Sequence, residues 1–204
     1  MNNTFQDEIK IQLNAIVSYP HLHAKWLNTL SYLENCGARK IASCEHPTLV
    51  KEEMIKHAAE EFRHAYYLKR QIKRISNFPL IDYAIDNMLG GIATRHYLNK
   101  LDVHVSRFLK TQGLSPSAIK ATAYVLVTYV IELRAAELYP IYDEILKKNH
   151  SPITIKSILL EEKEHLKEME DELSRIKNGE IFMVKVRQIE EIICQRWIEN
   201  IKIR

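Results

Sequence analysis

Apolar residues recur every three or four positions along most of this chain, which is the spacing of one face of an α-helix. The periodic stretches are long, and short segments that contain proline, glycine or asparagine separate them. Clear strand-like alternation is absent. The pattern predicts an all-α protein, and we expect residues 1–204 to form one helical domain. The predicted helices are a leading one from Thr4 to about Pro20, His21–Cys44, a helix from Pro47 and Thr48 to about Ser76, one or two accessory helices within Leu80–Gln112, a long helix from Pro116, Ile153–Lys177 and Glu180–Ile203.

Local signals mark the long helix that begins at Pro116. Ser115 is suited to cap its N-terminus, and proline is tolerated at the first helical position. Pro140 is expected to kink the same helix further along. Residues Ala121–Ile131 are apolar nearly all round, which predicts that this helix is the most buried one.

Four of the predicted helices carry a glutamate in the middle of their apolar face. In the first of them, Glu34 lies at helical spacing from Leu30 and Ala38. A bare carboxylate is costly in a protein core, so buried charges are usually paired or bind metal ions. The neighbouring Glu60 and Glu161 fall outside the apolar stripes and are expected to face solvent. The inward-facing glutamates of the four helices are Glu34, Glu61, Glu132 and Glu162.

Two of these glutamates each begin a Glu-x-x-His motif, namely Glu61 with His64 and Glu162 with His165. Residues three apart lie on nearly the same face of a helix, so both members of a pair can reach one ion. Glu34 precedes Glu61 by 27 residues and Glu132 precedes Glu162 by 30. Each interval is enough for one helix to end and the next to return antiparallel. The two halves together predict one metal site with six ligands.

The order of these six residues resembles that of the ferritin-like di-iron carboxylate superfamily, which carries Glu, Glu-x-x-His, Glu, Glu-x-x-His on four helices. The matching residues are Glu34, Glu61, His64, Glu132, Glu162 and His165. The resemblance covers roughly Trp26–Met169 and implies a ferritin-like four-helix bundle with accessory helices at the N-terminus, in the middle and at the C-terminus. It also implies two bound iron ions. Four carboxylates and two imidazoles suit iron, manganese or a mixed iron and manganese pair.

Members of this superfamily include iron-storage ferroxidases, rubrerythrin-like peroxide reductases, oxygenases and desaturases. The resemblance therefore implies an oxidoreductase that activates O2 or peroxide to oxidise a small substrate or ferrous iron. No side chain beyond the metal ligands is assigned a catalytic role. The substrate, the electron donor and the formation of a homodimer stay open. The alternatives are a non-enzymatic bundle that binds or buffers iron, and an oxygenase similar to tRNA hydroxylases.

Some residues near these motifs have two interpretations. Glu137 also lies on an apolar stripe and is the rival of Glu132, although Glu132 is placed more centrally. His57 is expected to be a buried, hydrogen-bonded histidine, with a role as supplementary ligand as the alternative. Thr128 and Tyr139 are expected to be core residues. Their alternatives are a place in an oxygen pocket for Thr128 and redox activity for Tyr139.

Composition and charge narrow the class of protein. The hydrophobic share of 46% and the charged share of 27% are ordinary for a globular chain. Three cysteines without a Cys-x-x-Cys pair favour a reducing cytoplasm, and a net charge of +3 is too small to predict binding to nucleic acid. Residues Met1–Lys10 lack the pattern of a secretion signal, and the longest apolar run is too short to span a bilayer. We therefore expect a cytoplasmic protein without a membrane partner.

Overall fold

A computed structural model describes residues 3–46, 48–77 and 80–201 of the chain. In these residues it contains seven α-helices, two short 3-10 helices and no strand, which confirms the all-α class. No helix in this part of the chain is both long and apolar enough to cross a membrane. The α-helices are α1 (Asn3–Ser18), α2 (Pro20–Cys44), α3 (Glu52–Gln71), α4 (Gly91–Thr111), α5 (Pro116–Lys148), α6 (Lys156–Ser174) and α7 (Gly179–Ile201). The 3-10 helices are Ile72–Arg74 and Ile85–Asn87.

The predicted helix limits are close to the observed ones but not identical. Helix α3 begins at Glu52 instead of Thr48, and α6 begins at Lys156 instead of Ile153. Such differences are usual because the apolar period reports the body of a helix and not its terminal turn. The predicted limits at Pro47 and Ile203 lie outside the described residues.

The start of α5 follows the predicted capping signal. The Ser115 side chain accepts a hydrogen bond from the backbone N–H of Ala118 at 3.3 Å, and Pro116 occupies the first helical position. The helix continues through Pro140 as one element to Lys148. This long helix is the central one, because it contacts α1, α2, α4, α6 and α7.

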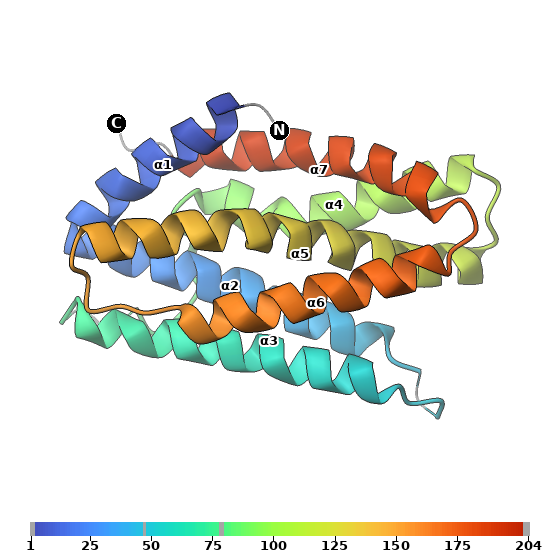
Figure 1. The fold of residues 1–204 in the computed structure, drawn as a ribbon, viewed down its shortest axis with the longest axis horizontal. Coiled ribbons are helices and arrows are strands. Elements are labelled where there is room, and N and C mark those ends of the chain that lie inside the picture. Colours follow the sequence, from blue (N-terminus) through green and yellow to red (C-terminus); the bar gives the residue numbers. More distant parts are fainter. Residues whose placement is uncertain (1–2, 47, 78–79, 202–204) are drawn as a thin grey trace.

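The helices form a bundle in which most axes follow the long dimension of the molecule (Figure 1). Helices α2 and α3 pack against each other as an antiparallel pair, and α5 and α6 form a second pair. Contacts of α3 with α6 and of α2 with α5 join the two pairs. Helices α4 and α7 pack together and against α5, while α1 contacts α2, α5 and α7. Four helices thus surround the space between the two pairs.

Large apolar side chains fill the core away from that space. Trp26 and Tyr142 are fully buried, and Trp26 stacks on Trp197 with 5.9 Å between ring centroids. Arg134 of α5 donates hydrogen bonds of 2.9 and 2.6 Å to the carboxylate of Glu190 on α7. Because both groups are buried, this bidentate pair fixes the position of α5 relative to α7.

Candidate metal centre

Four helices bring the six predicted residues together with His57 in two groups that could each hold a metal ion. In both groups the candidate ligand atoms lie within 4.8 Å of one another, and Glu61 belongs to both. We call them the one-histidine group, formed by Glu34, Glu61, His64 and Glu162, and the two-histidine group, formed by His57, Glu61, Glu132 and His165.

The one-histidine group joins α2, α3 and α6. The Nδ1 atom of His64 lies 3.0 Å from Glu162 Oε1, 3.6 Å from Glu61 Oε1 and 3.9 Å from Glu34 Oε2. The other carboxylate oxygen of Glu34 accepts a hydrogen bond from the hydroxyl of Tyr139 on α5. Glu34 therefore keeps one oxygen directed at the group while the other is held by a buried tyrosine.

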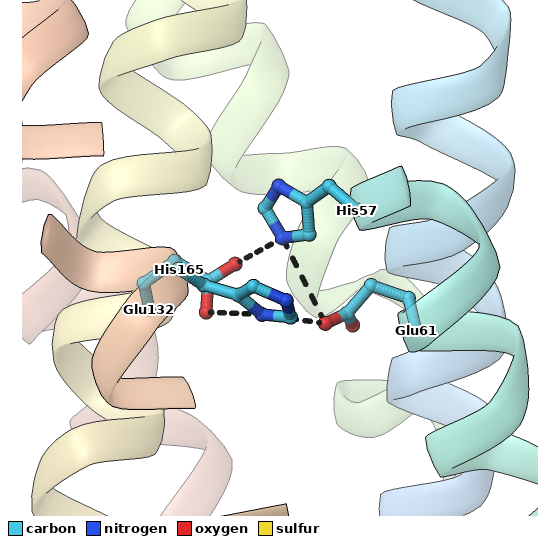
Figure 2. Close-up of side chains that lie close together, drawn as sticks. All are labelled: His57, Glu61, Glu132 and His165. Atoms are coloured by element: carbon cyan, nitrogen blue, oxygen red, sulfur yellow. Dashed lines mark hydrogen bonds and ion pairs between the residues drawn. The ribbon is translucent and has the colours of Figure 1, made fainter. Parts of the chain in front are cut away.

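The two-histidine group joins α3, α5 and α6 (Figure 2). The Nε2 atom of His57 lies 3.0 Å from Glu132 Oε1 and 3.8 Å from Glu61 Oε1. The Nδ1 atom of His165 lies 3.4 Å from Glu61 Oε1 and 3.8 Å from Glu132 Oε2. The two imidazole rings face each other with 4.0 Å between their centroids. One oxygen of Glu61 is thus near nitrogen atoms of three histidines.

The distances within both groups fit shared coordination better than direct hydrogen bonding. Ligand atoms on an octahedral ion with bonds of roughly 2.1 Å lie about 3 Å apart in cis and about 4 Å apart in trans. Most of the separations above are too long for a hydrogen bond. Four of the buried atoms have no hydrogen-bond partner among the described residues, and buried polar atoms rarely stay unpaired. They are Glu61 Oε1, Glu162 Oε1, His64 Nδ1 and His165 Nδ1.

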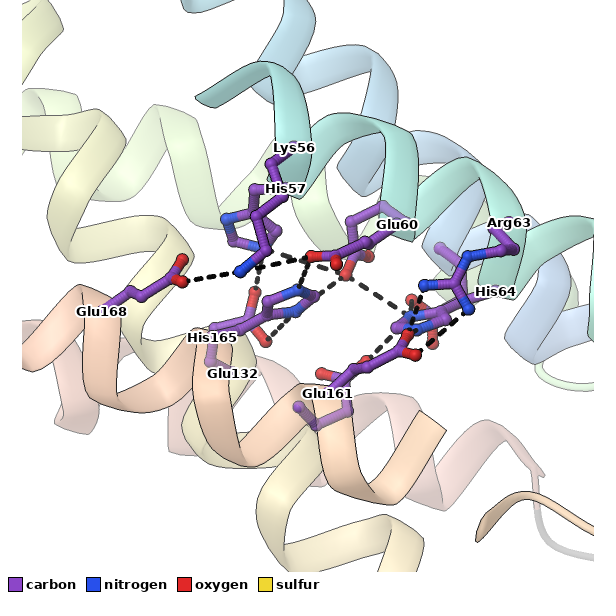
Figure 3. Close-up of polar contacts among 12 residues, drawn as sticks. Lys56, His57, Glu60, Arg63, His64, Glu132, Glu161, His165 and Glu168 are labelled. Atoms are coloured by element: carbon purple, nitrogen blue, oxygen red, sulfur yellow. Dashed lines mark hydrogen bonds and ion pairs between the residues drawn. The ribbon is translucent and has the colours of Figure 1, made fainter. Parts of the chain in front are cut away.

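The Nε2 atoms of His64 and His165 point away from the two groups, and each contacts the glutamate that directly precedes the other Glu-x-x-His motif (Figure 3). His64 Nε2 lies 2.6 Å from Glu161 Oε2, and His165 Nε2 lies 2.9 Å from Glu60 Oε2. A carboxylate can only accept, so Nε2 of each ring donates its N–H outward, and Nδ1 is the nitrogen that faces the other candidate ligand atoms. Arg63 in turn donates hydrogen bonds of 3.1 and 2.6 Å to Glu161.

These outer carboxylates correct a prediction from the sequence. Glu60 and Glu161 do not simply face solvent, since their side chains are only 20% and 23% exposed and each contacts a histidine from the other helix. The sequence contained a signal for them. Both motifs read Glu-Glu-x-x-His, and the first glutamate is repeated at the same place in each half.

Crowding of acidic and imidazole groups changes their protonation. Burial opposes a charge on His64, but the close carboxylates of Glu162 and Glu61 outweigh it and raise the pKa of His64 to about 12. For His165, burial is outweighed by contacts that begin with Glu61, and its pKa is raised to about 10. Burial and the nearby charge of Glu61 raise the pKa of Glu132 to about 7. The metal-free centre therefore retains protons that water-exposed groups would lose.

The other carboxylates of the centre follow the same physics. Burial and then the charge of Glu61 raise the pKa of Glu34 well above its ordinary value. Burial and then the charge of Glu132 do the same to the pKa of Glu162. Glu61 is the exception, because its contacts with the imidazoles of His165 and His64 outweigh its burial and lower its pKa. Cations that enter this centre must displace protons from it.

The structure also bears on three of the residues for which the sequence allowed two interpretations, Glu137, His57 and Thr128. Glu137 accepts a hydrogen bond of 2.6 Å from Arg134 and belongs to neither group, whereas Glu132 is in the two-histidine group. His57 is buried and contacts Glu132, as predicted, yet it also belongs to that group, which was only the alternative. Thr128 is buried, as expected of a core residue, and it also lines a cavity beside Glu132.

Comparisons of the chain with protein-family models, with curated proteins and with solved structures found no match. The fold and the site by themselves define a helical bundle whose interior carries two overlapping groups of glutamate and histidine that could bind metal ions.

Proposed function

We propose that this protein is a di-iron carboxylate oxidoreductase of the ferritin-like type, with manganese or a mixed pair as the alternative metals. The observation that carries the proposal is the sharing of Glu61 between the one-histidine and the two-histidine group. A shared carboxylate is what two adjacent ions require, and two ions are more than a structural site needs. Helices α2, α3, α5 and α6 would be the four ligand helices, with α1, α4 and α7 as accessories.

The donor atoms support hard or borderline metal ions. Carboxylate oxygens and imidazole nitrogens supply every candidate ligand, and the three cysteines lie outside both groups. Such sets suit iron and manganese, whereas structural zinc favours thiolates and a closed tetrahedron. Four ligand carboxylates balance the charge of two divalent ions. When bound, an iron pair would supply electrons to O2 or peroxide.

The residues around the metals have separate roles in this proposal. Glu60 and Glu161 hold the Nε2 protons of His165 and His64 and so orient both rings. His57 is a seventh ligand, which gives the two-histidine group one more nitrogen than its neighbour. Most residues of the centre are buried, which limits the contact of the metals with bulk water.

The proposal is tested by anaerobic titration with ferrous iron followed by exposure to O2. We expect two iron ions per chain, an absorbance change that depends on O2, and continued O2 consumption when reductant is supplied. If O2 consumption stops once the bound ferrous iron has been oxidised, even with reductant present, iron storage is favoured. If iron binds tightly but does not react with O2, a metal buffer is favoured. Failure to bind any of iron, manganese or cobalt would contradict the proposal.

The cross-motif hydrogen bonds give a second test. We expect Glu60→Gln and Glu161→Gln each to weaken metal binding by roughly 10- to 100-fold, because an amide supports the ligand histidine less well than a carboxylate does. Glu164→Gln is the matched control, since Glu164 lies on α6 near Glu161 but is exposed. Competition titration with a metal indicator measures the affinities. Equal affinity in all three variants would contradict the assigned role of Glu60 and Glu161.

A further inference from the structure

A cavity of about 260 Å³ reaches the two metal-binding groups from the side of α2, α4 and α5. Glu61 and Glu132 form part of its wall at the inner end. A smaller cavity of about 70 Å³ continues past the same two glutamates toward Tyr139. The two cavities also share the wall residues Gly37, Leu98 and Ile131. Open space therefore adjoins the metal centre, which a purely structural or buffering site does not need.

Gly37 keeps the inner end of this cavity open. It lies one turn of α2 after Glu34, and a Cβ atom placed on it would meet only one neighbour within 4 Å, Glu61 Oε2 at 3.4 Å. A longer side chain at this position would extend into the cavity beside the shared carboxylate. Glycine is costly inside a helix, by up to about 1 kcal/mol relative to alanine, so its presence here is unfavourable for α2 alone.

The wall of the larger cavity changes from apolar to charged along its length. Its middle is lined by apolar side chains, among them Ile41, Leu98, Val127 and Ile131. Its outer part contains Lys40, Asp102 and Lys120, and Lys40 forms an ion pair with Asp102. Among the described residues no carboxylate is paired with Lys120, so the outer end carries an excess positive charge.

The outer end opens toward the surface. A hollow of about 460 Å³ between the ends of α2, α3, α5 and α6 shares Cys44, Lys120 and Tyr124 with the cavity. A ligand could enter there and pass Lys120 before reaching the apolar section. The cavity itself is smaller than the roughly 300–1,000 Å³ of sites for drug-sized molecules, which restricts its ligand to a small compound.

We propose that this cavity binds the organic substrate of the metal centre and that this substrate is a small, mainly apolar carboxylic acid. Its carboxylate would lie at Lys120 and Lys40, and its apolar end would lie beside Glu61 and Glu132, where the metal ions would bind. The proposal rests on the proposed function for the role of the metals. The charge at the outer end selects an acid over an amine, because Asp102 is already neutralised by Lys40.

Isothermal titration of the metal-loaded and the metal-free protein with octanoate, 1-octanol and octylamine tests the proposal. We expect octanoate to bind more tightly than the other two compounds in both states. Gly37→Leu is expected to weaken octanoate binding at least about tenfold by filling the inner end, while Gly37→Ala changes it less than about threefold. Lys120→Gln should weaken it roughly two- to fivefold, and the exposed Lys110→Gln on α4 should leave it unchanged.

Ala123→Leu provides a second obstruction from the opposite wall, on α5, should Gly37→Leu fail to fold. Equal binding of octanoate and 1-octanol would overturn the assignment of a carboxylate. If octanoate still binds to both obstructing variants, its binding site lies elsewhere and the assignment of this cavity is wrong. The absence of octanoate binding to the unaltered protein would overturn the proposal as well. The metal content of each sample is measured in parallel, so a chain that binds octanoate but no metal refutes the proposed function separately.

Discussion

Replacing Glu61 by alanine is expected to abolish tight binding of both metal ions. Glu61 belongs to the one-histidine and the two-histidine group, and its Oε1 atom lies 3.4–3.8 Å from nitrogen atoms of three histidines. Loss of a shared ligand should exceed the effect of losing a supporting hydrogen bond, so we expect affinity to fall by more than about 100-fold. Metal analysis after gel filtration and anaerobic calorimetry with ferrous iron measure the change.

A contrasting variant makes this prediction specific. His57→Ala removes a ligand from the two-histidine group alone, so we expect it to weaken the binding of one ion and to leave the other bound. Among the described residues the Nδ1 atom of His57 has no hydrogen-bond partner, unlike the outer nitrogens of His64 and His165, so His57 is the less firmly oriented candidate ligand. Glu164→Ala is the control. Two tightly bound ions in Glu61→Ala would exclude a shared carboxylate.

Metal binding is expected to raise the thermal stability of the protein strongly. A ligand at about 1,000 times its Kd stabilises the folded state by roughly 4 kcal/mol per site. For a chain of 150–250 residues, each 1 kcal/mol shifts the midpoint of unfolding by about 2–4 °C. One filled site should therefore raise the midpoint by roughly 8–16 °C. Differential scanning calorimetry with and without manganese measures this, and an unchanged midpoint at saturating metal would contradict binding to the folded state.

The stability of the metal-free protein is expected to fall as pH rises above about 6.5. The folded-state pKa of His64 is about 12 and that of His165 about 10, both above the ordinary value, so their stabilising protons are fully bound below about pH 6.5 and are lost toward the folded pKa. The pKa of Glu132 is raised to about 7, so its charged form destabilises the fold increasingly between about pH 4.5 and 7. Burial lowers the pKa of His23 and of His57 to about 4, so these two groups act in the opposite direction below about pH 6.5, and the net decrease in stability is expected above that value.

Metal ions should remove most of this pH dependence, because they take the place of the protons. We expect metal affinity to increase with pH and the release of at least two protons per filled centre near pH 7, one each from His64 and His165. Denaturant unfolding at several pH values and proton release into weak buffer measure the two quantities. A metal-free protein that becomes more stable from pH 7 to 9 would contradict the arrangement of charges.

The apolar period identified the helices and the inward-facing glutamates because both are local properties. A carboxylate at the centre of an apolar stripe is visible in one helix, as for Glu34 between Leu30 and Ala38. The same reasoning preferred Glu132 to Glu137, and of these two the structure places only Glu132 in a group that could hold a metal ion. The apolar period could not decide between the two interpretations of His57, because a buried histidine has the same local sequence pattern whether it binds a metal or only a hydrogen-bond partner.

The sequence alone determined the all-α class and the six residues whose acidic and imidazole side chains meet in the interior. Only the tertiary structure decided that Glu61 is shared, that Glu60 holds a histidine 105 residues away, and that Gly37 opens a cavity at the centre. These features depend on how far α3 and α6 are rotated and shifted against their neighbours. Helical periodicity fixes the face of each helix but carries no information about that register.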